Sequence, residues 1–125
     1  MAPDYDALVA WLREAYGDRL RWVASFDHGR FSHRVRFVRD DLKTELTEQQ
    51  LDVVVHRSLA VFNRDHVEDV YAHLGPARAL VVEHERATAI HVYLDDEQGV
   101  VVKLEPAATV EVPGFAADCR DRLGA

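Results

Sequence analysis

Three consecutive strand-like segments between Ala77 and Leu104 constrain the fold of this chain more than any other feature. They cover Ala77–His84, Thr88–Leu94 and Gly99–Leu104, and short polar turns join them. Short segments rich in β-branched residues and separated by turn residues are typical of neighbouring antiparallel strands. The run therefore predicts a three-strand meander, which needs the rest of the chain to cover its apolar side chains.

The stretch Leu20–Val38 predicts a β-hairpin. Apolar residues alternate with arginines on both sides of a turn at Asp27-His28-Gly29-Arg30, and a period of two places alternate side chains on opposite faces of a strand. We expect one apolar and one cationic face. The apolar face would carry Leu20, Trp22, Ala24, Phe26, Phe31, His33, Val35 and Phe37, and the cationic face Arg19, Arg21, Arg34 and Arg36.

Helical patterns flank these strands. Asp4 is a suitable N-cap for a helix over Tyr5–Tyr16, and Gly17 is a natural stop. A second helix, Gly114–Leu123, would close the chain. With two helices between the hairpin and the meander, the order becomes α-β-β-α-α-β-β-β-α. This order predicts an α+β fold of two or three layers around a five-stranded antiparallel sheet.

The longer of the two middle helices, Leu46–Asn63, has an unusually wide apolar surface. Thr47 and Gln50 have the spacing of a capping box at its start. A helix with so much apolar surface can pack on a sheet with one side and on a partner with another. The core face would carry Leu51, Val54, Val55, Leu59 and Phe62, widened by Val53 and Val61. We therefore predict that Val53, Val54 and Val61 bind a partner, in the first place a second copy of this chain.

The shorter middle helix follows Asp65, which with Glu68 has the spacing of another capping box. Its apolar stripe would consist of Val67, Val70, Tyr71 and Leu74, and Gly75-Pro76 would end it. We expect this stripe to pack against the rest of the domain.

Composition limits the classes of partner. At 125 residues the chain forms one domain, 1–125, with a core of its own. Its net charge of -7 argues against general binding to nucleic-acid backbones, which requires a basic surface. The single cysteine, Cys119, cannot form an internal disulfide, and no segment resembles a signal peptide or a membrane-spanning helix. We expect a cytoplasmic protein that binds no membrane.

The arginine face is the clearest polar feature of the chain. Arg19, Arg21, Arg34 and Arg36 could dock an acidic protein or a phosphate-bearing ligand through their planar guanidinium groups. Nucleic acid is a weaker alternative, because this face offers no exposed aromatic side chains for base stacking. Alternatively, the arginines pair with carboxylates of the long helix or face water.

Other candidate sites carry weaker signals. His66, Asp69 and His73 fall on one face of the shorter helix, but they lack a fourth ligand and the His-Glu-x-x-His spacing of zinc enzymes. We therefore assign no metal and no cofactor. His33 on the apolar side of the hairpin and Tyr93 in the meander are candidate polar contacts for a small ligand. The serines lie outside any nucleophile elbow, and Cys119 falls on the apolar side of the last helix.

Two resemblances extend this interpretation. The strand-ending segment Arg36–Leu42, the segment Glu68–Tyr71 and the strand-entering segment Asp95–Leu104 resemble those of a family of small haloarchaeal proteins of uncharacterised function. The similarity runs in the same order from about Leu8 to Leu123. It implies a salty cytoplasm, which would account for the acidity and for only two lysines, Lys43 and Lys103.

The order of elements is also similar to that of the roadblock/longin, profilin-like class. That resemblance implies a five-stranded antiparallel sheet, homodimers or heterodimers, and action on small GTPases or on motility and trafficking machinery. Because fold does not fix function, three hypotheses remain. The first is a non-enzymatic, self-associating interaction or regulatory module. The second is a small-ligand or sensory domain using His33 and Tyr93. The third is a metal protein or enzyme built on His66, Asp69 and His73.

Overall fold

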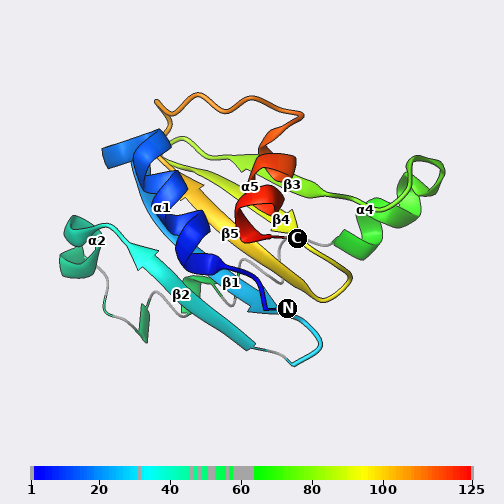
Figure 1. Ribbon diagram of the computed structural model, residues 1–125, viewed down its shortest axis with the longest axis horizontal. Coiled ribbons are helices and arrows are strands. Elements are labelled where there is room, and N and C mark those ends of the chain that lie inside the picture. Colours follow the sequence, from blue (N-terminus) through cyan, green and yellow to red (C-terminus); the bar gives the residue numbers. More distant parts are fainter. Residues whose placement is uncertain are drawn as a thin grey trace.

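The computed structural model describes residues 2–30, 32–45, 47, 49–50, 53–55, 57 and 64–124. In these residues, five antiparallel strands form one open sheet in the order β2-β1-β5-β4-β3 (Figure 1). The strands are β1 (Leu20–Asp27), β2 (Ser32–Val38), β3 (Ala79–Glu83), β4 (Thr88–Tyr93) and β5 (Gln98–Leu104). The hairpin and the meander predicted from the sequence are confirmed, and pairing of β1 with β5 joins them.

The described helices agree with most of the predicted ones. They are α1 (Tyr5–Tyr16), α2 (Asp40–Glu45), α4 (Arg64–Val70) and α5 (Phe115–Leu123), with 3-10 turns η1 (Gly17–Arg19) and η2 (Ala72–Leu74). Asp4 caps α1 as expected, because its carboxylate accepts from the Ala7 N–H at 3.0 Å. The short helix α2 was not predicted. It buries Leu42 and places two aspartates in its first turn, where they suit the helix dipole.

The start of the long middle helix follows the predicted capping box. The Gln50 N–H donates to Thr47 Oγ1 at 3.1 Å, and the Thr47 N–H donates to Gln50 Oε1 at 2.9 Å. Residues 49–50, 53–55 and 57 are helical. Reciprocal bonds of this kind satisfy two N–H groups that the first turn would otherwise leave without partners, so the helix begins where the sequence predicts.

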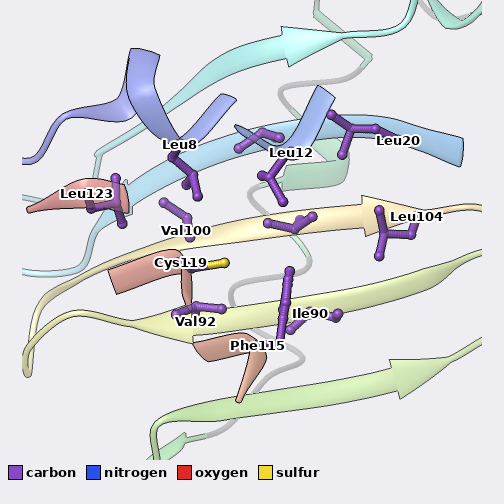
Figure 2. Close-up of a cluster of buried hydrophobic side chains, with 12 residues drawn as sticks. Leu8, Leu12, Leu20, Ile90, Val92, Val100, Leu104, Phe115, Cys119 and Leu123 are labelled. Atoms are coloured by element: carbon purple, nitrogen blue, oxygen red, sulfur yellow. The ribbon is translucent and has the colours of Figure 1, made fainter. Parts of the chain in front are cut away.

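Helices α1 and α5 cover the same face of the sheet (Figure 1). A bond from the Asp4 N–H to Leu123 O, 3.0 Å long, joins the start of α1 to the end of α5. Figure 2 shows the core between them and the sheet, in which two leucines of α1 and three residues of α5 meet the valines and leucines of β1, β4 and β5. These helix residues are Leu8, Leu12, Phe115, Cys119 and Leu123.

A second core lies on the opposite face of the sheet. Trp22, Phe26 and Val101 pack there against Leu42 of α2 and Val55 of the long middle helix. The described elements therefore form three layers, with helices on both faces of the sheet. The prediction of two or three layers is resolved in favour of three.

The two-faced hairpin predicted from the sequence is wrong for β1. This strand lies between β2 and β5, and both of its faces are covered, so that Val23 belongs to one core and Trp22 and Ala24 to the other. The register is irregular between Leu20 and Trp22, and Leu20 packs in the same core as Val23. A strict period of two could not predict this, because a bulge shifts side chains between faces.

Candidate functional site

Three consecutive valines show which sides of the long middle helix are occupied. Val55 is completely buried in the second core, and Val54 is half-buried against the same core. Val53 is 47% exposed, so it points away from the sheet. Of the predicted partner-binding valines, Val53 is therefore the accessible one among the described residues. Val61 lies outside the described residues.

Most of the predicted stripe of the shorter helix is exposed, contrary to expectation, although Val67 is half-buried. Val70, Tyr71 and Leu74 are 57%, 53% and 70% exposed, respectively. The predicted capping box at Asp65 and Glu68 is also wrong, because Arg64 is already helical and forms an ion pair with Glu68. In the described residues, α4 instead meets the end of β4, where Arg64 NH1 donates to Asp95 O at 2.7 Å.

Two of the four arginines predicted to share a cationic face lie near the start of β1. Arg19 precedes the strand, in η1, and its Nε donates to Tyr16 O at 3.4 Å. Arg21 forms an ion pair with Glu105, at 2.8 Å between NH1 and Oε1. Arg21 therefore pairs with a carboxylate that follows β5, whereas the alternative left open by the sequence named carboxylates of the long helix.

The other two arginines lie on β2, on the side of the sheet that α1 covers. Arg34 is opposite Ser25 in the sheet register, and Arg36 Nε donates to Ser25 Oγ at 2.9 Å. The guanidinium of Arg36 also lies over the Tyr5 ring of α1, 4.1 Å from its centroid. The four arginines therefore do not form one continuous cationic face. Arg36 is in contact with Tyr5 of α1, and Arg21 is paired with Glu105.

Glu105 anchors the network at the end of β5. Its Oε1 lies 2.8 Å from Arg21 NH1 and 2.9 Å from Arg39 NH1. Burial alone would raise the pKa of Glu105, but hydrogen bonds from Arg39 and Arg21 outweigh it and lower that pKa. Arg39 also pairs with Asp41 of α2. The network therefore fixes α2 to the ends of β1 and β5.

We expect Glu105→Gln to lower the free energy of unfolding by about 1–2 kcal/mol, because it leaves two partly buried arginines with a weaker acceptor. Urea unfolding followed by circular dichroism measures this change. Asp40→Asn is a matched control, since Asp40 pairs with Lys43 at 3.3 Å on the open surface, where an ion pair contributes little. Equal losses in the two variants would contradict a structural role for Glu105.

His33 and Tyr93 are not brought together. They lie in one row across the sheet, on β2 and β4, with Phe26 and Gly99 between them. Three inter-strand spacings separate them by about 14 Å. Tyr93 is almost fully buried, and burial raises its pKa to about 12. The two candidate polar contacts therefore lie apart in the sheet, and their role in binding a small ligand stays a prediction.

An aromatic cluster occupies the space between them. The Phe26 ring lies over Gly99 and meets the Tyr93 ring in an edge-type contact, with centroids 6.0 Å apart. The buried His91 ring lies 5.9 Å from the Phe26 ring, measured between centroids. No sequence pattern indicated this buried histidine, because only the pairing of β4 with both β3 and β5 places it in the middle of the sheet.

The other candidate residues do not converge on one site. His66, Asp69 and His73 are all exposed. In the part of the chain that the structure describes, no group of three histidines, cysteines or acids could hold a metal ion. Cys119 is buried, and burial raises the pKa of its thiol to about 12, which suits a packing role.

Comparison with known proteins defines the family of the chain. A family model described as "Domain of unknown function (DUF7522)" matches residues 6–124. The chain belongs to this family. No curated protein matches it. Among the described helices of this DUF7522 member, none has the length and apolarity needed to cross a membrane.

A solved structure supports the fold-level resemblance. The structure described as "MglB with tetrameric arrangement" superposes on this DUF7522 member with a TM-score of 0.54 and 17% sequence identity. The match covers 95% of this chain and 80% of the other. At this identity the likeness concerns the fold alone, and it supports the resemblance to the roadblock/longin class. The haloarchaeal resemblance stays a prediction.

Proposed function

We propose that this protein is a non-enzymatic interaction module that acts by binding other proteins and that it associates with itself through the outer side of the long middle helix. The observation that carries this proposal is the exposure of Val53, 47% of whose surface is accessible while Val55, two residues on, is fully buried. Because Val55 of the same helix already packs on the sheet, the apolar side chain of Val53 on its outer side is available for contact with a second protein. The MglB structure, which has a similar fold and a tetrameric arrangement, supports the proposal because it shows that a chain of this fold can assemble.

The strand β3 offers a second contact surface. It lies at one edge of the described sheet, and Val81 at its centre is 46% exposed. An edge strand presents N–H and C=O groups that can pair with another chain. Contact through this edge would extend the sheet, whereas contact through Val53 would pair helices, and the two can be separated by mutation.

We expect the wild-type chain to run at twice its 14.2 kDa mass in size-exclusion chromatography with light scattering, at low and at molar salt. Persistence at molar salt is expected because an apolar contact is not screened. Val53→Asp is expected to give a monomer, since a carboxylate would be buried in the contact without a partner. Val54→Asp is a poorer test, because Val54 packs on the second core and its loss would disturb folding.

The matched control is Val112→Asp, which makes the same chemical change at a side chain that is 63% exposed in the loop before α5. It should leave the dimer intact. Val81→Lys tests the edge of β3, and a monomer from this variant alone would move the interface from the helix to the sheet. A wild-type monomer at both salt concentrations would overturn the proposed self-association. The cytoplasmic location of the protein stays a prediction.

A further inference from the structure

A shallow groove lies where the start of α1 meets the β1–β2 hairpin. Its volume is about 380 Å³, and the residues that line it include Tyr5, Ser25, Arg34 and Arg36, together with Arg30 and Asp27. This volume falls in the range of small-molecule sites. The groove is thus built from one helix and two strands, and it is separate from the helix and edge-strand surfaces described above.

The guanidinium of Arg36 is held in place without being neutralised. Its Nε donates to Ser25 Oγ at 2.9 Å, and its Cζ lies over the Tyr5 ring, 4.1 Å from the centroid. Ser25 is itself buried and donates to Arg34 O at 3.5 Å. Both terminal nitrogens of Arg36 are left for another acceptor, since no hydrogen bond within the described residues uses them. A fixed, planar donor pair of this kind suits an oxyanion.

The local charge of the groove is positive in a strongly acidic chain. Neither Arg34 nor Arg36 forms an ion pair with any carboxylate in the described parts of the chain, although the net charge is -7. Asp27 is occupied by Arg30, whose N–H donates to Asp27 Oδ1 at 3.2 Å. Burial, and then the charge of Arg34, lower the pKa of Arg36, while Tyr5 and Asp6 raise it. The two neighbouring arginines therefore repel one another, and an anion between them would relieve that repulsion.

We propose that this groove binds the phosphate or carboxylate group of a small molecule, with Arg36 as the forked donor and Arg34 as the second cation. A polyanion such as nucleic acid fits less well, because the chain as a whole has a net charge of -7 and would repel an extended phosphate backbone. The Tyr5 ring forms an apolar wall beside the anion position. This site is independent of the self-association proposed above.

The test is isothermal titration of the full chain at low ionic strength with two probes, inorganic phosphate and succinate. Binding of either probe with a Kd in the millimolar range or below supports the site, and the tighter one identifies the anion class. Arg36→Gln should weaken binding about tenfold or more, because it removes charge-assisted hydrogen bonds. Arg36→Lys should weaken it as well, since it keeps the charge but loses the fork.

Arg13→Gln is the matched control. Arg13 also stacks on an aromatic ring, that of Phe37 at 5.1 Å, and it lies on α1 but outside the groove. Should Arg36→Gln fail to fold, the exposed Arg34 supplies the second variant, Arg34→Gln. Absence of binding by both probes at about 10 mM, or equal weakening by Arg13→Gln and the groove variants, would overturn the proposal. A glutamate-rich peptide that binds at least about tenfold more tightly than either probe would overturn the small-molecule assignment.

Discussion

Replacing Gly99 with alanine is expected to lower the free energy of unfolding by about 3 kcal/mol. A Cβ at this position would lie 2.4 Å from Phe26 Cζ and 2.4 Å from the carbonyl oxygen of Val92. The second of these atoms belongs to the backbone of β4, so the clash cannot be relieved by moving a side chain alone. A domain of this kind has a free energy of unfolding of about 5–15 kcal/mol, so the loss expected for Gly99→Ala is a large fraction of the total and is readily measured.

Urea unfolding of the purified variant, followed by circular dichroism, measures this loss. Gly29→Ala is the control, because the atoms nearest to a Cβ there belong to the carboxylate end of Glu97, the first at 2.5 Å, and that exposed side chain can move away. We expect Gly29→Ala to change stability by about 0.5 kcal/mol or less. Similar midpoints for the two variants would show that the Phe26 ring does not lie over Gly99 as described.

A double variant locates the clash further. Phe26→Leu removes the ring that covers Gly99, at its own cost in packing of about 1–2 kcal/mol. In this background Gly99→Ala should lower the free energy of unfolding by less than in the wild type, because the contact with the Phe26 ring is gone while that with Val92 O remains. If Gly99→Ala lowers the free energy of unfolding equally in the wild type and in Phe26→Leu, the whole effect arises from the contact with the β4 backbone.

Local signals in the sequence were sufficient for two helix starts and for the five strands, although they predicted neither α2 nor the start of α4. Asp4 and the Thr47–Gln50 pair predicted two helix starts, and both sets of hydrogen bonds are present. These signals work because a cap satisfies backbone N–H groups within a few residues of itself, whatever the rest of the fold does. The turns of the meander were equally local, and each strand lies within a few residues of its predicted bounds.

Which face each side chain occupies could not be predicted, because it depends on non-local pairing. The hairpin pattern treated β1 as half-exposed, but β5 pairs with its free side and helices cover both of its faces. The apolar stripe predicted for the shorter middle helix is mostly exposed for the converse reason. A helical period indicates that one side is apolar, but it cannot show that the sheet has room for that side.

The candidate sites show the same limit. Arg34 and Arg36 stand out in the sequence because they alternate along one strand. Their partners Tyr5 and Ser25 come from a helix and from another strand, and no spacing in the sequence links them. The proposed anion groove is therefore a product of how α1 crosses the sheet, and it becomes visible only in three dimensions.

His91 illustrates a titratable group that the fold buries. It pairs with Leu80 and Val101 on the neighbouring strands and is 1% exposed. Burial, and to a lesser degree the charge of His28, lower the pKa of His91 to about 3. In the unfolded chain an imidazole has its ordinary pKa of about 6.5. The unfolded state therefore takes up a proton more readily than the folded state at every pH between these values.

Stability that depends on neutral His91 should be complete above about pH 6.5 and should be lost as the pH falls toward 3. Between about pH 8 and pH 5 we expect His91 to account for a loss of about 2 kcal/mol. Urea unfolding of the wild type and of His91→Leu at about pH 8, 6.5 and 5 measures this contribution, because carboxylates titrate alike in both proteins. The variant should show the shallower pH dependence, whereas His84→Leu, at an exposed turn position, should follow the wild type. If His91→Leu loses stability as steeply as the wild type, His91 is not the group that makes the fold sensitive to acid.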